Sequence, residues 1–202
     1  KVRILIDQAH QQAWAVKPDV AAQLNPANPA DASYAKMAEA ASAHDFEIAL
    51  HEAGLFDSKA LETADVLVIP HASSPEWEQT IQVGSAKFTD AELAAIEAFV
   101  ADGGSLLLLA ETEQPKYGNN FAELAAKFGV EVKNSTVQDP SRSYKDVPTW
   151  IISEFDRLTN QTLPSWLNKF ASIAPAPLKF RQMLRPRFSC APLNTRPQLQ
   201  LR

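Results

Sequence analysis

Cysteine is almost absent from this chain of 202 residues, which contains Cys190 and no other cysteine. A single cysteine excludes an internal disulfide and any zinc site that is built from several thiolates. Glycine is scarce too, with six residues in the whole chain, and neither a Gly-x-Gly-x-x-Gly motif nor a Walker loop occurs. Both absences disfavour dinucleotide and nucleoside triphosphate binding. No apolar run approaches the roughly 20 residues that a membrane-spanning helix needs, so we expect no membrane span.

Acidic side chains are missing from the last part of the chain. Residues 1–156 hold all 24 acidic residues and 11 of the 19 basic ones, a net charge of −13, whereas residues 157–202 hold 8 basic residues and have a net charge of +8. A basic arm for nucleic acid is one interpretation of this asymmetry. However, the interleaving of basic and aromatic residues that is typical of nucleic-acid-binding modules does not occur, so we expect no nucleic-acid partner.

The domain organisation follows from these changes in composition. Residues 1–135 are predicted to form one α/β domain, residues 136–174 an extension with an extra strand and helix, and residues 175–202 a basic, Pro- and Arg-rich tail. The chain starts at Lys1 rather than Met, which we interpret as the boundary of a fragment cut from a longer protein; removal of an upstream signal is one way in which such a boundary arises. The Ala-rich composition is typical of bacteria, and both a cytoplasmic and a secreted location stay open.

Strand and helix patterns alternate through the first 135 residues. Short apolar runs predict five strands, at Val2–Asp7, Phe46–Leu50, Asp65–Pro70, Ser105–Leu109 and Val130–Val132. Segments with helical periodicity predict helices at Ser33–His44, Thr89–Asp102 and Asn120–Phe128, and the second of these starts with a Thr89–Glu92 capping box. Ser105–Leu109 is expected to be buried on both faces. Further strand and helix patterns cover Tyr144–Ile152 and Leu163–Phe170.

This alternation predicts an α/β fold, specifically a flavodoxin-like three-layer sandwich with a central, mostly parallel sheet in the order 2-1-3-4-5. In that topology a crevice forms where the loops after strands 1, 3 and 4 meet, and ligands bind at such crevices. The polar and aromatic side chains of these loops are therefore the candidate ligand-binding residues: Asp7, Gln8, His10, Trp14, His71, Ser73, Ser74, Glu111, Thr112, Tyr117 and Asn119.

Four segments carry a resemblance to a known family, namely ILIDQAH, ADVLVIPHASS, FTDAELAAIEAFVADGGSLLLLAE and NNFAELAAKFGVEV. Over roughly residues 1–135 the chain resembles the class I glutamine amidotransferase-like superfamily, and especially its trehalose-utilisation-type and intraflagellar-transport-type branches. Members that hydrolyse glutamine place a cysteine on the turn after the central strand. Here that turn holds Glu111 and Thr112, and Cys190 is far away. The resemblance therefore implies a fold and a crevice without glutaminase activity.

Two kinds of catalysis are conceivable at this crevice. His10, His71, Asp7 and Glu111 are the residue types that hold a divalent metal, which would activate water for hydrolysis. Alternatively, Ser73 or Ser74 could act as a nucleophile beside one of these histidines. The sequence lacks both a local His-Glu-x-x-His spacing and a Gly-x-Ser-x-Gly elbow. We therefore expect no cofactor, and His10, His71, Glu111 and Ser73 remain the catalytic candidates.

Binding without catalysis is the interpretation that we favour. Trp14, Trp77 and Tyr117 could stack on a sugar ring while polar neighbours bind its hydroxyl groups. We therefore expect a non-catalytic ligand-binding or accessory domain, whose partner is a carbohydrate, another polar small molecule, or a neighbouring domain or protein. A metal-assisted hydrolase acting at the same crevice is the alternative, and a homodimer is compatible with either function.

Overall fold

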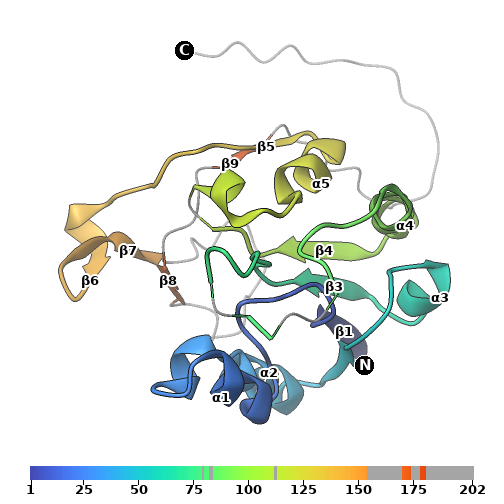
Figure 1. Ribbon diagram of the computed structural model, residues 1–202, viewed down its shortest axis with the longest axis horizontal. Coiled ribbons are helices and arrows are strands. Elements are labelled where there is room, and N and C mark those ends of the chain that lie inside the picture. Colours follow the sequence, from blue (N-terminus) through green and yellow to red (C-terminus); the bar gives the residue numbers. More distant parts are fainter. Residues whose placement is uncertain (79, 82–83, 112, 154–169, 174–177, 181–202) are drawn as a thin grey trace, which may run out of the picture.

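The computed structural model describes residues 1–78, 80–81, 84–111, 113–153, 170–173 and 178–180 (Figure 1). Its centre is a parallel sheet of four strands in the order β2-β1-β3-β4. The strands are β1 (Val2–Asp7), β2 (Phe46–His51), β3 (Val66–Ile69) and β4 (Ser105–Leu108). Helices flank this sheet, so the predicted α/β, flavodoxin-like class is confirmed, as is the strand order 2-1-3-4. Since β1, β3 and β4 are neighbours and parallel, their carboxyl ends lie at one edge of the sheet.

Five α-helices lie in the described residues, and α4 is the longest of them. They are α1 (Pro18–Leu24), α2 (Ala35–Ala43), α3 (Ser58–Leu61), α4 (Asp90–Ala101) and α5 (Phe121–Lys127), with 3-10 turns at Pro29–Ala32, Gln114–Tyr117 and Pro140–Arg142. The main core joins Leu67 and Ile69 of β3 to Ile96 of α4 and Phe121 of α5. None of the helices in the described part of the chain is long and apolar enough to cross a membrane.

Helix α4 is fixed at both ends by local chemistry. The predicted capping box is present, because the Thr89 side chain accepts a hydrogen bond from the Glu92 amide and the Glu92 carboxylate accepts one from the Thr89 amide. After the helix, Gly103 has a φ of 102°, which is a left-handed conformation that glycine adopts at little cost. A Cβ atom on Gly104 would lie 2.3 Å from the Phe99 ring, so this position must stay small for the ring to pack there.

Strand β4 differs from its prediction. The expectation that its apolar run is buried on both faces was wrong, because Leu107 is 46% exposed. The fifth predicted strand, β5 (Val130–Val132), is present but does not continue the parallel sheet after β4. It pairs antiparallel with β9 (Leu178–Phe180) instead. In the described residues β4 is therefore an edge strand.

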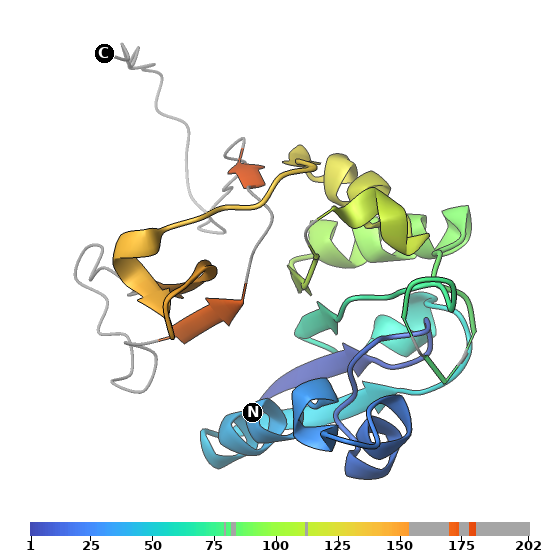
Figure 2. The same ribbon diagram turned by 60° about the vertical axis from the view of Figure 1, so that its left-hand side comes forward.

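The chain after β5 forms a second, antiparallel sheet of three strands. These are β6 (Ser143–Tyr144), β7 (Val147–Ser153) and β8 (Phe170–Ile173), paired in that order. Figure 2 shows this sheet apart from the parallel one. The strand predicted at 144–152 is thus confirmed, whereas the helix predicted at 163–170 lies, except for Phe170, outside the described residues.

Candidate functional site

His10 forms the centre of a buried group at the end of β1. Its Nδ1 atom lies 2.9 Å from Oδ2 and 3.0 Å from Oδ1 of Asp7, and its Nε2 atom lies 2.8 Å from Oε1 of Glu92. His10 is 2% exposed and the two carboxylates are fully buried. We call Asp7, His10 and Glu92 the His10 triad. The imidazole also packs against two aromatic rings. Its centroid lies 4.6 Å from that of the Phe88 ring and 5.3 Å from that of the Phe56 ring.

The two carboxylates of the His10 triad have further partners. Glu92 accepts hydrogen bonds from the Phe56 amide at 3.0 Å and from the Thr89 amide at 2.8 Å. Asp7 accepts one from the Gln12 side chain at 2.7 Å and another from the Ala9 amide at 3.0 Å. Buried carboxylates need such partners, because an unpaired buried charge is strongly destabilising. The triad therefore ties the exit of β1 to the first turn of α4.

The protonation of this group follows from its geometry. Burial alone would lower the pKa of His10, but the hydrogen bonds and charges of Asp7 and Glu92 outweigh burial and raise it above 6.5. Burial would raise the pKa of Glu92, yet hydrogen bonds from Thr89, Phe56 and His10 lower it below 4.5. The imidazolium form thus donates both ring protons to carboxylates, and neither nitrogen is available to a substrate.

His71 lies at the exit of β3 and has very different surroundings. It is 5% exposed, and neither ring nitrogen makes a hydrogen bond. Its Nε2 atom lies 3.5 Å from Oε1 of Glu78, a distance that brings the two groups together without a hydrogen bond. The ring of His71 packs edge-to-face against the ring of Tyr117, with their centroids 4.3 Å apart. A buried imidazole whose nitrogen atoms make no hydrogen bond is costly, so its position calls for an explanation.

Two carboxylates and two phenols belong to the same region as His71. Burial raises the pKa of Tyr34 far above 10.0, and the charges of Glu111 and Glu78 raise it further. Burial also raises the pKa of Tyr117, and the same two carboxylates add to that shift, while Lys116 opposes it. Both phenols therefore experience the negative charge of both carboxylates. We call His71, Glu78, Glu111, Tyr34 and Tyr117 the His71 cluster.

Other aromatic residues and a lysine border the His71 cluster. The ring of Trp14 lies 5.3 Å from that of Tyr34, and Trp77 is 55% exposed. The Lys116 ammonium lies 5.1 Å from the centre of the Tyr117 ring and 5.6 Å from that of Trp77. It also forms an ion pair of 2.6 Å with Glu113. Of the predicted aromatic residues, Tyr117 thus contacts His71 at the exit of β3, Trp77 shares the Lys116 ammonium with Tyr117, and Trp14 contacts Tyr34.

The remaining predicted residues mainly hold loops together. Ser73 is fully buried and its hydroxyl donates to the Ser74 carbonyl at 3.3 Å, while the Ser74 amide donates to the Tyr117 carbonyl at 2.8 Å. Asn119 accepts a hydrogen bond from Gln114 at 2.7 Å and donates to the Ala72 carbonyl. These bonds join the exits of β3 and β4. Thr112 lies outside the described residues.

The candidate metal ligands do not form one group. His10 is held by Asp7 and Glu92, whereas His71 is close to Glu78. In the described ranges no three His, Cys, Asp or Glu side chains are arranged to hold a metal ion. The four residues proposed from the sequence are therefore divided between the His10 triad and the His71 cluster.

Sequence reasoning missed Glu92 and Glu78 as site residues. Glu92 is recognisable in the sequence as the last residue of a capping box, but no local pattern reveals that its second function is to bind His10. Tyr34 lies in the segment Ser33–His44, which was predicted as a helix and not as part of a site. Two buried side-chain oxygens lack a hydrogen-bond partner, those of Gln8 and Thr80. Gln8 was among the predicted site residues, and Thr80 was not.

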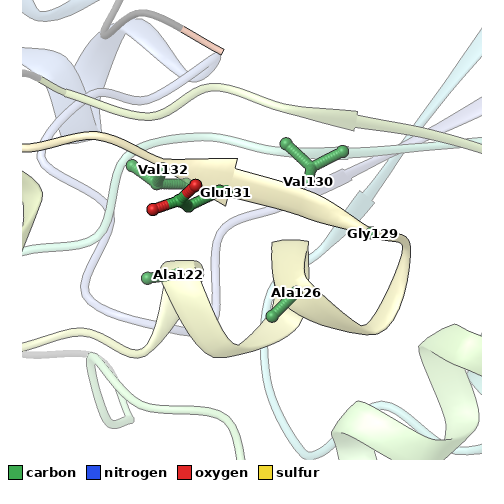
Figure 3. Close-up of a pocket in the computed structure, with 6 residues that line it drawn as sticks. All are labelled: Ala122, Ala126, Gly129, Val130, Glu131 and Val132. Carbon is green, nitrogen blue, oxygen red and sulfur yellow. The ribbon is translucent and has the colours of Figure 1, made fainter. Parts of the chain in front are cut away.

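A hollow lies between α5 and β5 and is lined by none of these residues (Figure 3). Its lining is small and apolar except for one carboxylate, and consists of Ala122, Ala126, Gly129, Val130, Glu131 and Val132. Polar groups that could orient a ligand do not converge there. The His71 cluster is therefore the better candidate site.

No protein-family model matches this sequence, and no curated protein matches it. Among solved structures, the chain is similar to one described as "mmIFT52 N-terminal domain", with a TM-score of 0.60 and 15% sequence identity. The similarity covers 90% of this chain and 69% of that one. At this identity the likeness shows a shared fold.

Proposed function

We propose that this chain is a non-catalytic accessory domain that binds a polar ligand, or a polar group of a protein partner, at the His71 cluster. The observation that carries the proposal is His71 itself, which is 5% exposed and has no hydrogen bond at either ring nitrogen. A ligand that supplied those hydrogen bonds would compensate the cost of burying the ring. Unpartnered buried polar groups of this kind are more typical of binding sites than of cores.

The non-catalytic part of the proposal rests on His10. A general base needs a ring nitrogen within reach of the substrate, and both nitrogens of His10 bind buried carboxylates. Ser73, one of the two candidate nucleophiles, donates its hydroxyl proton to a backbone carbonyl. Amidotransferase-like descent is part of the same proposal; it rests on the resemblance in sequence, in which Glu111 and Thr112 stand on the turn where glutaminases carry a cysteine. The similar IFT52 domain agrees with an accessory role.

Binding can be tested by NMR spectroscopy on the full chain. The backbone amide spectrum would be recorded with maltose, with n-butylammonium chloride and with sodium acetate, which are respectively neutral, cationic and anionic polar probes. We expect at least one probe to shift the amide signals of His71 and Tyr117 in a saturable way. The signals of Trp150, on β7, serve as the internal control and should not move.

Two results would contradict the proposal. One is that none of the three probes shifts the signals of His71 and Tyr117 at millimolar concentration. The other is that a shifting probe is chemically converted by the protein, because conversion would favour the hydrolase alternative. The His71→Leu variant should lose the response, whereas Glu39→Gln, on the exposed surface of α2, should retain it.

A further inference from the structure

Two asparagines of this chain stand in the pattern Asn-x-Ser/Thr, with a residue other than proline in the middle. The two segments are Asn134-Ser-Thr136 and Asn160-Gln-Thr162. This tripeptide is the acceptor pattern for N-linked glycans, and it is used where it lies in a surface loop of an exported protein. Because the pattern is short, its structural context decides what it means. Asn160 lies outside the described residues, so the context can be read at Asn134.

Asn134 lies in the connection between β5 and the 3-10 turn at Pro140–Arg142. Residues 133–139 of this connection belong to neither a helix nor a strand, and Asn134, Ser135 and Thr136 are all exposed. Figure 1 shows the connection as the amber segment that runs from β5 towards β6. A transferase has to bind the asparagine amide and the hydroxyl group two residues later at the same time. It therefore needs an exposed segment whose backbone is not part of a helix or a sheet, and this connection is such a segment.

Two other asparagines show what a structural side-chain amide looks like in this molecule. The Nδ2 atom of Asn119 donates a hydrogen bond to the Ala72 carbonyl, and that of Asn120 donates one to the Phe88 carbonyl at 2.9 Å. These bonds hold loops in place, and neither residue stands in the acceptor pattern. Asn134 combines the pattern with an exposed position in an irregular connection.

We propose that Asn134 is a modification site, the acceptor of an N-linked oligosaccharide. In the transfer, Nδ2 of Asn134 forms a bond to C1 of the first sugar of an oligosaccharide that is carried on a lipid diphosphate. The bond between C1 and the diphosphate oxygen breaks, and the lipid diphosphate leaves with the electron pair of that bond. Nδ2 loses one proton to the solvent, and the reaction needs no oxidant or reductant.

A glycan at this position is compatible with the fold and independent of the proposed function. Asn134 is already exposed, so attachment of a sugar displaces no core residue. The connection follows β5, whereas His71 lies at the exit of β3. Transfer takes place during export, so the inference requires that the chain is exported, which is one of the two locations that the sequence leaves open.

The inference is tested by importing the full chain into endoplasmic-reticulum microsomes behind a cleavable signal sequence. We expect a fraction of the chain to gain the mass of an oligosaccharide, which an endoglycosidase removes and which peptide mass spectrometry places on Asn134. A known glycoprotein imported into the same microsomes shows that the transferase is active. An imported chain that carries no glycan on Asn134, beside a modified reference protein, would overturn the inference.

Three variants, all made together with Asn160→Gln so that the second pattern cannot contribute, identify the acceptor. Asn134→Gln removes the acceptor and Thr136→Ala removes the hydroxyl group that the pattern requires, and each should abolish the added mass. Thr136→Ser keeps a hydroxyl group at this position and should retain the added mass. Persistence of the added mass in Asn134→Gln, or equal modification of Thr136→Ala and Thr136→Ser, would contradict the assignment of Asn134 as the acceptor.

Discussion

The Nε2 atom of His10 lies 2.8 Å from Oε1 of Glu92, although the two residues are 82 positions apart in the chain. One of them follows the first strand of the sheet, and the other belongs to the capping box of α4. The contact gives Glu92 two functions, since it caps the helix and also holds His10 against Asp7. His10 thereby has a structural function, which leaves His71 as the one of the two candidate histidines that can bind a ligand.

Replacing His10 should destabilise the fold strongly. In His10→Gln, the buried carboxylates of Asp7 and Glu92 lose the cation between them, and breaking a buried ion pair in this way costs about 3–5 kcal/mol. The measurement is the free energy of unfolding from urea titration near pH 6. His44→Gln makes the same change at an exposed position and should cost no more than about 0.5 kcal/mol. Equal stability of the two variants would contradict a structural role for His10.

The stability that the His10 triad supplies should decrease at both high and low pH. The pKa of His10 is raised above 6.5, so its contribution is complete below 6.5 and is lost as the pH rises through the raised pKa. The pKa of Glu92 is lowered below 4.5, so its contribution is complete above 4.5 and is lost as the pH falls through the lowered pKa. The stability difference between the natural chain and His10→Gln should therefore be largest between pH 4.5 and 6.5. A stability difference between the two proteins that increases above pH 7 would contradict this prediction.

Replacing His71 should have the opposite effect from replacing His10. His71→Leu removes two buried nitrogen atoms that have no hydrogen bonds, and an apolar group of similar size avoids their desolvation cost. The variant should be as stable as the natural chain or more stable by about 1–3 kcal/mol. Thermal unfolding followed by circular dichroism measures this. A loss of stability comparable to that of His10→Gln would mean that His71 is also structural.

The packing of Gly104 gives a prediction that is independent of the site. In Gly104→Ala the new Cβ atom would lie 2.3 Å from the Phe99 ring, so the ring must move out of its place. Overpacking of this kind costs about 1–3 kcal/mol. The double variant Gly104→Ala/Phe99→Leu has a smaller side chain opposite the new methyl group and should recover part of the loss. Urea unfolding of both variants measures the difference, and additive losses would contradict this account of the glycine pair.

Local patterns in the sequence were sufficient for most of the parallel sheet. The strands at Val2–Asp7 and Val66–Ile69 are short apolar runs between polar residues, and the capping box at Thr89 marks the start of α4. These signals depend only on neighbouring residues. Strand order followed from the general preference of such folds, which is why 2-1-3-4 is confirmed although no single residue encodes it.

Features that depend on distant contacts were not predictable in the same way. The run that forms β4 has the same composition whether its neighbour is a strand or solvent, so the exposure of Leu107 has no signature in the sequence. Val130–Val132 is a strand by pattern, but its antiparallel partner lies about fifty residues later, at Leu178–Phe180. The different surroundings of His10 and His71 were unpredictable for the same reason. They depend on Glu92 and Glu78, which lie elsewhere in the chain and contact His10 and His71 respectively.

The imidazole signals of the histidines give the most direct test of the central claim, which is that His71 serves a ligand and His10 serves the fold. Their ring ¹H–¹⁵N signals would be recorded in the full chain during titrations with each of the three probes, maltose, n-butylammonium chloride and sodium acetate. We predict a saturable shift of the His71 ring signals, with the His10 signals unchanged throughout. Unchanged His71 signals, or equal shifts at both histidines, would contradict the claim.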